Sequence, residues 1–364
     1  MSLTSTEFYF ALNYCNSAQP NRYAIFYLLF QTQQVAFLCV LFTLTVTANC
    51  IVLTLIYLSR KLKSRMNMFI ANLACADLLV AFFFVLTDII WKLTIQWYAG
   101  NIGCKLIKFI QAVGTYGSTY ALVALSIDRL DAIARPMSMR GKTRRCRILI
   151  GLNWSCAVIF SIPMLLSYNL QLVDGHMPQC WMQLPEPWMW KVYITLIAIL
   201  LLIIPALIIA FCYIFIVIVI WRRSSLSLNT ANSSEQTRIV SKDATSHSPS
   251  DQRKRVHWTE CNVSSRGLIP KAKIKTIKMT FVIVLAFVLC WSPYFVYDLL
   301  DVYGHIPRTN EMIAVSTFIQ SLAPLNSAAN PIIYMLFNSK MYKKFLKNKH
   351  HNGSPITSAT RSHV

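Results

Sequence analysis

The residues of this chain that could do chemistry are a few ionisable and amide side chains inside long apolar segments. Asp77 stands in the middle of one such segment. In another segment, Lys108 and Gln111 lie near the start, and the pair Asp128-Arg129 lies at the end. Because a charged side chain at the centre of a membrane helix costs roughly 2.5–3.5 kcal/mol, each of these positions needs a reason to be there.

The Asp77 carboxylate suggests a hydrated pocket for a cation such as sodium. Polar residues of other segments that could meet it are Asn49, Ser118, Asn326 and Asn330. The alternative is a protonated, hydrogen-bonded aspartic acid in the core. No His/Cys spacing resembles a zinc site, and the sequence has no phosphate-binding loop or nucleophile–base arrangement. We therefore expect no resident cofactor and no enzymatic activity.

Arg129 can either pair with Asp128 or swing toward a partner protein that enters the bundle. A snorkelling arginine with no further role is the alternative.

A hinge is also indicated, because a proline inside a helix removes a backbone hydrogen bond and kinks the helix. The prolines deep in apolar segments are Pro205, Pro293 and Pro331.

The kink at Pro293 follows Trp291, and Phe287 lies one turn further in. We interpret this arrangement as a hinge whose outer half touches a pocket and whose inner half swings at the cytosolic face. The alternative for these aromatic side chains is ordinary core or lipid-facing packing.

Seven apolar stretches, each long enough to cross a bilayer core of about 30 Å, must position these residues. They lie near 35–58, 67–92, 105–131, 148–168, 190–221, 275–300 and 312–336. Of the 364 residues, 55% are hydrophobic and only 13% are charged, which excludes a soluble domain of this size. We predict an all-α membrane protein, a seven-transmembrane helix bundle, because helices satisfy their own backbone hydrogen bonds in lipid.

The formal net charge of +21 would suggest a nucleic-acid partner in a soluble protein. Here the basic residues gather in alternate loops, with four between 60 and 65, six between 135 and 147, and most of the rest in the long fifth loop and the C-terminal tail. By the positive-inside rule, these loops face the cytosol and the N-terminus lies outside. We therefore expect a multi-pass plasma-membrane protein surrounded by lipid, without nucleic-acid binding.

The chain divides into three predicted regions. Residues 1–34 form an extracellular N-terminal tail, 35–336 form the bundle, and 337–364 form a cytoplasmic tail. Within the bundle, 222–270 have the composition of a flexible cytoplasmic loop, and helical order is expected to resume near Pro270. The tail begins with a short C-terminal amphipathic helix, Lys340 to Lys349, which we expect to lie along the membrane surface.

Cys104 and Cys180 both lie on the outward side, where the oxidising environment permits a disulfide. Joined, they would pin the second outward loop across the mouth of the bundle. The rival partner is Cys15 in the N-terminal tail, and the sequence leaves that alternative open.

The apolar stretches also carry short motifs in a fixed order. They are Asn49, Leu73-Ala74 with Asp77, Asp128-Arg129, Trp154, Pro205 with Tyr213, Phe287 with Cys290-Trp291-Ser292-Pro293, and Asn330-Pro331-Ile332-Ile333-Tyr334. Over residues 35–348 this set resembles the marker set of rhodopsin-like G-protein-coupled receptors. The resemblance implies that Arg129 engages a heterotrimeric G protein, with Tyr213 and Tyr334 holding the active arrangement. It also implies that Trp291 and Phe287 relay ligand contact.

The extracellular half narrows the expected ligand. Amine receptors carry an aspartate where this sequence has Gln111, and the lysine that opsins need is absent from 312–336. Instead, Lys108, Gln111 and Thr115 resemble the vasopressin/oxytocin receptor pattern, as does the pair Cys180-Trp181.

A closer resemblance is to the crustacean cardioactive peptide receptors. It is carried by residues 265–273, by Trp291-Ser292-Pro293-Tyr294 and by residues 318–330. Neuropeptide S receptors are similar there, but less so. The resemblance implies a short amidated peptide ligand closed by a disulfide. A vasopressin/oxytocin-like or neuropeptide S-like peptide receptor, or a receptor active without ligand, remains the alternative.

We expect Lys108 and Gln111 to donate hydrogen bonds to the carbonyl groups of such a peptide. The other expected contacts are Thr115, the aromatic residues Trp97, Trp181, Tyr294 and Phe295, and the rim charges Asp88, Lys92, Asp298 and Asp301. For the two tryptophans the alternative is the interfacial aromatic belt, and for the rim charges it is solvation.

The sequence departs from the family pattern at three places. Leu130 stands where Tyr or Cys is usual and leaves basal activity open, Ala48 stands where Gly is commoner, and no cysteine follows Tyr334. A channel or transporter is disfavoured, because the charges inside the spans are few and no internal repeat is visible.

The C-terminal tail offers regulatory signals. Candidate receptor-kinase sites that could recruit an arrestin are Ser354, Thr357, Ser358, Thr360 and Ser362. An unmodified polar tail is the alternative. The ending Ser362-His363-Val364 resembles a PDZ ligand, an ending so short that it recurs by chance.

Overall fold

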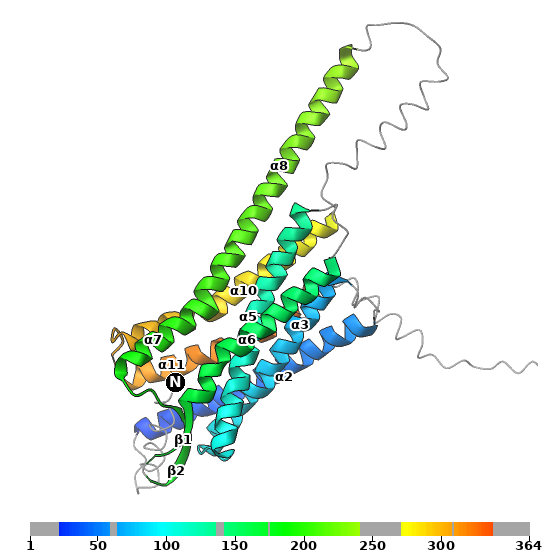
Figure 1. Cartoon of the computed structure of the whole chain (residues 1–364). Coiled ribbons are helices and arrows are strands. Elements are labelled where there is room, and N and C mark those ends of the chain that lie inside the picture. The colour runs from blue at the N-terminus through cyan, green and yellow to red at the C-terminus, as the bar shows by residue number, and fades with distance from the viewer. Residues whose placement is uncertain are drawn as a thin grey trace, which may run out of the picture.

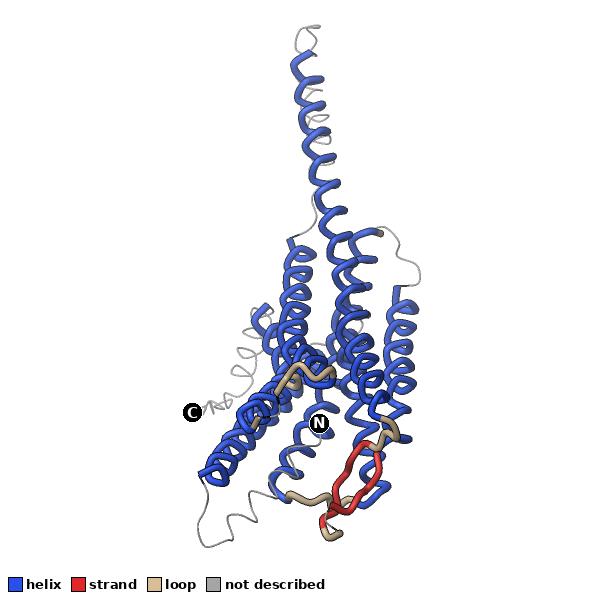
Figure 2. The backbone as a smooth tube through the Cα atoms, turned by 90° about the vertical axis from the view of Figure 1, so that its left-hand side faces the viewer, coloured by secondary structure: helices blue, strands red, loops and turns tan. Residues whose placement is uncertain are grey.

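The computed structural model describes residues 22–58, 64–135, 142–173, 175–240, 271–307 and 309–337 of the chain. Over these residues the protein is a bundle of long helices with one antiparallel hairpin (Figures 1 and 2). The hairpin lies at one end of the bundle, and helix α8 (Ile204–Val240) projects beyond the other end.

Helix occupies each of the seven predicted stretches, which confirms the helix bundle. The elements are α2 (Arg22–Leu58); α3 (Arg65–Leu79), π-helical η1 (Val80–Val85) and α4 (Leu86–Thr94); α5 (Gly100–Ala134); α6 (Lys142–Ser167); α7 (Pro187–Ala198), π-helical η2 (Ile199–Ile203) and α8; α10 (Lys271–Val302); and α11 (Asn310–Leu322) with α12 (Leu325–Phe337). The hairpin strands β1 (Tyr168–Val173) and β2 (Met177–Met182) connect α6 to α7.

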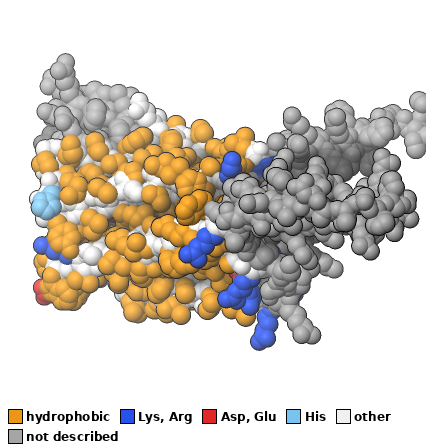
Figure 3. Space-filling model, turned by 90° about the horizontal axis from the view of Figure 1, so that it is seen from above, with side chains coloured by type: hydrophobic (Ala, Val, Ile, Leu, Met, Phe, Trp, Pro, Cys, Tyr) orange, Lys and Arg blue, Asp and Glu red, His pale blue; other side chains and the backbone are white. Residues whose placement is uncertain are grey.

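Five helical segments of the described chain are long and apolar enough to cross a membrane. They are Gln31–Leu58, Arg65–Thr94, Thr143–Ser167, Pro187–Arg222 and Ile277–Val302. The other two predicted spans are less apolar or interrupted: α5 carries several of the polar residues predicted to be functional, and the seventh span is split into α11 and α12. Figure 3 shows hydrophobic side chains over most of the described surface in that view, as lipid contact requires.

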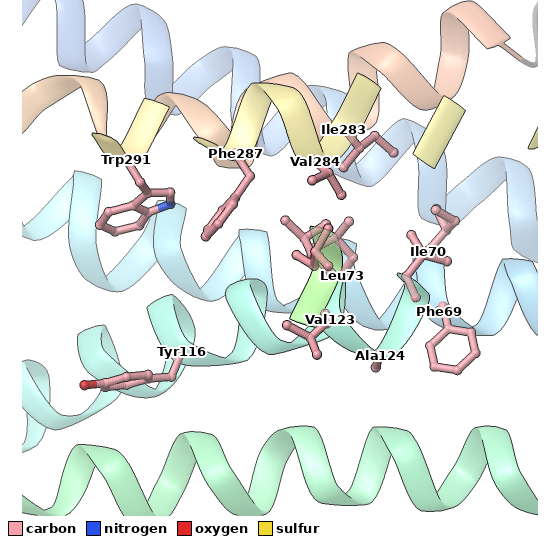
Figure 4. Packing of buried hydrophobic residues seen from close by; sticks show 14 of the residues in the cluster. Phe69, Ile70, Leu73, Tyr116, Val123, Ala124, Ile283, Val284, Phe287 and Trp291 are labelled. Atoms are coloured by element: carbon pink, nitrogen blue, oxygen red, sulfur yellow. The ribbon is translucent and has the colours of Figure 1, made fainter. Parts of the chain in front are cut away.

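Helix α5 packs against α3, α6 and α8 and forms the centre of the bundle. A side-chain carbon at Gly117 would lie 3.2 Å from the Trp154 ring, so this glycine permits the close approach of α6. The Trp154 Nε1 then donates to Asn72 Oδ1 of α3 at 2.8 Å. Figure 4 shows Phe287 and Trp291 of α10 projecting toward core residues of α3 and α5.

Two of the three expected kink prolines lie inside continuous helices, Pro293 in α10 and Pro331 in α12. The π-helical turn η2 ends two residues before Pro205, whereas η1 contains no proline. Because proline cannot donate a backbone hydrogen bond, a local change of helical pattern next to it is expected.

Two boundaries differ from the sequence-based expectation. Helix α2 begins at Arg22, within the segment predicted as an extracellular tail, and α8 continues through 222–240, where a flexible loop was predicted. Residues 222–240 contain neither proline nor glycine, so nothing in the sequence stops the helix that enters from the span. The rest of the predicted loop, the amphipathic tail helix, the candidate kinase sites and Cys15 lie outside the described residues.

Candidate functional site

A cavity of about 300 Å³ opens at the hairpin end of the bundle, between α4, α5, α7, α10 and α11. Ten of the eleven side chains expected to contact a ligand line it: Asp88, Lys92, Lys108, Gln111, Thr115, Trp181, Tyr294, Phe295, Asp298 and Asp301. Trp97 does not, because it is buried beneath the hairpin beside the disulfide.

The Lys108 ammonium lies against two aromatic rings. Its Nζ atom is 4.8 Å from the centroid of the Trp91 ring and 5.5 Å from that of the Tyr168 ring. Within the described part of the chain, no carboxylate lies within salt-bridge distance of Lys108; Asp88 instead pairs with Lys92 at 3.9 Å. Ring faces attract a cation without consuming its directed hydrogen bonds, so this ammonium can still donate to a ligand.

One turn further along α5, Gln111 and Thr115 differ in whether their side chains are already hydrogen-bonded. The Thr115 hydroxyl donates to the backbone carbonyl of Gln111 at 2.8 Å. The Gln111 side-chain amide makes no hydrogen bond to any described residue, so its donor and acceptor are both available to a ligand. Lys108 and Gln111 therefore provide adjacent hydrogen-bonding groups on one wall of the cavity.

The α10 wall is aromatic and acidic. Trp291 stacks on Phe295 with ring centroids 5.6 Å apart, and Tyr294 meets both rings edge-on. A side-chain hydrogen bond joins Tyr294 to Asp298. Trp291 is only 8% exposed, and Phe287 below it is fully buried. Ligand contact with this wall would thus reach the helix next to Pro293.

The hairpin forms a roof over part of the cavity. The predicted disulfide between Cys104 and Cys180 is present, with a Cα–Cα distance of 5.5 Å, and it ties β2 to the start of α5. Leu170 of β1 pairs with Cys180, and its N–H donates to Asn101 Oδ1 at 2.9 Å. Burial raises the pKa of Tyr168, also on β1, to about 12, so its phenol stays neutral.

Sequence reasoning missed several lining residues. They include Gln31, Gln34, Trp91, Tyr168, Trp190, Tyr193, Gln320 and Ser321. A hydrogen bond of 2.8 Å from Gln34 to the Ser321 hydroxyl closes the side of the cavity between α2 and α11. For Gln320 the available signal was polarity inside an apolar stretch, as for Gln111, whereas Gln34 lies just before the first predicted stretch, 35–58.

The Asp77 region is a separate polar cluster in the core. Asp77 accepts from the Ser118 hydroxyl at 2.7 Å and from Asn330 Nδ2 at 2.9 Å. Asn49 does not join them, because its amide donates to the backbone of Thr45 and Ser327.

A void of about 10 Å³ lies near this cluster and is lined by Ser118, Asn326 and Ser327, among others. The side-chain oxygens of Asn326 and Asn330 are buried without a hydrogen-bond partner among the described residues. Carboxylate and amide oxygens are ligands that a sodium ion accepts, but neither Asp77 nor Asn330 lines this void, so the cation site stays a prediction.

At the opposite end, Asp128 holds two arginines. Its carboxylate lies 2.6 Å from Arg129 Nη2 and 2.9 Å from Arg65 Nη1. Asp131, one turn on, pairs with Arg145 of α6 at 3.1 Å. Tyr213 and Tyr334 are both buried in the same core. In this arrangement the Arg129 guanidinium is occupied within the bundle rather than presented to a partner.

Comparisons with known proteins show which family the chain resembles. The family described as "7 transmembrane receptor (rhodopsin family)" matches residues 48–334. A neuropeptide S receptor of Rattus norvegicus is 36% identical over 331 residues, covering 91% of this chain and 83% of the relative. The corresponding receptor of Mus musculus is 38% identical over 316 residues, covering 87% and 79%. An isotocin receptor of Catostomus commersonii is 35% identical over 311 residues, covering 85% and 75%.

Proposed function

Because the chain belongs to the rhodopsin family of seven-transmembrane receptors, we propose that it binds a short extracellular peptide and activates heterotrimeric G proteins. Members of this family are multi-pass membrane receptors and not enzymes. The observation that carries the peptide proposal is one cavity that gathers Lys108, Gln111 and the aromatic wall of α10 beneath a disulfide-tied hairpin.

In the proposed membrane orientation, the cavity opens to the extracellular side. The disulfide at the cavity mouth needs an oxidising environment, which the extracellular side provides. The basic residues Arg65, Arg145 and Arg147 lie at helix ends away from the hairpin, as the positive-inside rule expects of a cytosolic face. This orientation supports a plasma-membrane receptor with an extracellular N-terminus.

The chemistry of the cavity favours a peptide over a small amine. Lys108 and Gln111 can donate to backbone carbonyls, and a cavity shielded from water strengthens such hydrogen bonds. Trp181, Tyr294 and Phe295 add apolar and aromatic contact area. Gln111 bears no charge, so this wall of α5 offers a cationic amine no counter-ion.

For the ligand itself, we propose a short, amidated peptide closed by a disulfide, similar to the cardioactive peptide. The sequence resemblance in 265–273 and 318–330 supports this choice. Relatives named as neuropeptide S receptors and an isotocin receptor favour two other peptides, which form the second candidate class.

In the proposed mechanism, ligand contact with the aromatic wall of α10 changes the position of Arg129 at the cytosolic end. A peptide that packs against Trp291 and Phe295 favours a different arrangement of α10, which bends at Pro293. The cytosolic ends of the helices then separate, and Arg129 leaves Asp128 to meet the G protein. The peptide acts by binding the active arrangement more tightly than the resting one.

The coupling must be reciprocal. A G protein that stabilises the active arrangement should therefore raise the affinity for the peptide, and equal affinity with and without G protein would contradict the scheme.

We further propose that sodium binds near Asp77 in the resting state, and that receptor kinases and an arrestin act on the C-terminal tail after activation.

A dose–response experiment tests the proposal. Calcium and cyclic AMP are measured in cells that express the chain and receive cardioactive peptide, neuropeptide S, isotocin, vasopressin or oxytocin. A potent response to one peptide alone identifies the ligand class. No response to any of them, with surface expression confirmed, would contradict a receptor for these peptides.

A further inference from the structure

Gln179 of β2 is a buried amide next to the disulfide, and it makes two hydrogen bonds to the far end of α4. Its side-chain oxygen accepts from Trp91 Nε1 at 2.9 Å, and its side-chain nitrogen donates to the Ile95 carbonyl at 2.7 Å. Gln179 is only 2% exposed. Because both ends of the amide are used, its orientation is fixed, and it ties the hairpin to α4.

The backbone that Gln179 holds is strained. Ile95 has φ of 63°, and in the described part of the chain it is the one non-glycine residue with positive φ. A β-branched residue disfavours this left-handed conformation, which persists only when its surroundings enforce it. The surroundings here include the Gln179 bond and a backbone bond of 2.8 Å from Trp97 to Pro178.

The clamp formed by Gln179, Trp91 and Ile95 includes a ring that the Lys108 ammonium contacts. Ile95 N–H donates to the Trp91 carbonyl and ends α4, while Gln179 holds the indole of Trp91. Lys108 lies over the face of that ring, and its ammonium also meets the ring of Tyr168 from β1 of the same hairpin. The hairpin therefore controls both rings on which the ammonium rests.

We propose that Gln179 is a positioning residue for ligand binding. By locking Trp91 and Ile95, it fixes the aromatic face against which Lys108 lies and so sets the direction in which Lys108 donates to the ligand. The ligand part of this inference rests on the proposed peptide-receptor function, whereas the positioning of Lys108 can be tested without any ligand.

A purely structural role is the competing explanation, in which Gln179 only attaches the hairpin. Gln171 provides a matched control, because it pairs with Gln179 across the same hairpin and its side chain makes no hydrogen bond to a described residue. A Gln171→Leu variant removes an amide from the hairpin without touching Trp91.

The first test is ligand-free. Lysines of the purified full-length receptor are dimethylated with ¹³C, which keeps their charge, and the Lys108 signal is assigned from its loss in Lys108→Arg. Ring currents should shift this signal upfield in the native protein and in Gln171→Leu. In Gln179→Leu it should move toward the position of exposed lysines; an unchanged upfield signal would overturn the proposal.

If Gln179→Leu does not reach the membrane, Trp91→Phe gives the same comparison, because it keeps a ring but removes the N–H that Gln179 holds. Loss of the upfield shift supports positioning through the clamp. Retention of the shift in Trp91→Phe would overturn it.

The second test measures coupling, using the most potent peptide of the panel. Gln179→Leu should reduce potency about tenfold in the native background but less than about twofold in Lys108→Met, because the two residues act through one contact. Equal losses in both backgrounds would show that Gln179 acts independently of Lys108 and overturn the inference. If no peptide of the panel produced a signalling response, the proposed function would be rejected. The position of the Lys108 NMR signal would still decide whether Gln179 positions Lys108.

Discussion

Arg65 and Asp128 join the start of α3 to the end of α5 through a hydrogen bond of 2.9 Å from Nη1 to Oδ1. The other oxygen of this carboxylate accepts from Arg129 Nη2 at 2.6 Å. The Asp128 side chain is 4% exposed and that of Arg129 is 12% exposed. One buried carboxylate thus pairs with two guanidinium groups, and its contact with Arg129 Nη2 holds that side chain within the bundle.

Replacing Asp128 by Asn should raise signalling in the absence of ligand. The neutral amide no longer attracts Arg129, so the active arrangement becomes more populated, by about threefold to tenfold for a shift of about 1 kcal/mol. Basal cyclic AMP and calcium, normalised to surface expression, measure this. Asp131→Asn is the control, because Asp131 pairs mainly with the exposed Arg145; equal increases in both variants would exclude a specific role for the Asp128–Arg129 pair.

Replacing Asp77 by Asn should abolish the effect of sodium on peptide affinity. In the native protein, sodium would bind the resting arrangement through Asp77 and the unsatisfied oxygens of Asn326 and Asn330, and so weaken agonist binding. Competition binding in sodium chloride and in N-methylglucamine chloride measures the difference. A native receptor whose peptide affinity is the same in both salts would argue for a simple core aspartate.

Removing the disulfide should eliminate high-affinity binding. Cys104→Ser and Cys180→Ser each release β2 from α5 and, with it, the roof of the cavity. We expect each variant to lose at least tenfold in peptide affinity and the double variant to lose no more, because both substitutions break one bond. Cys39→Ser, at an exposed free cysteine, is the control; an additive double variant would contradict a shared bond.

The fold could be predicted from the sequence because two strong signals agree. The length of the apolar stretches limits each to one membrane crossing, and the basic loops indicate which ends of the spans face the cytosol. The extent of α8 could not be predicted, since the polar composition of 222–240 resembles a loop although it contains no helix-breaking residue.

The candidate site could be predicted only in part. Lys108 and Gln111 stand out because polar residues are rare in a span, and the structure brings them to one cavity wall. Trp91 and Tyr168 do not stand out, because aromatic residues are common near membrane interfaces. Their role depends on the hairpin path and on the strained Ile95, which are properties of the three-dimensional fold.

The most direct test of the account compares Lys108→Met and Gln111→Ala with Lys105→Met in peptide dose–response curves at matched surface expression. Lys105 lies on the same helix, but its ammonium donates to the Leu165 carbonyl and does not line the cavity. We predict that the first two variants lose about tenfold or more in potency, as expected for lost charge-assisted or buried hydrogen bonds, and that Lys105→Met retains native potency. Native potency in both cavity variants would contradict the proposed peptide site.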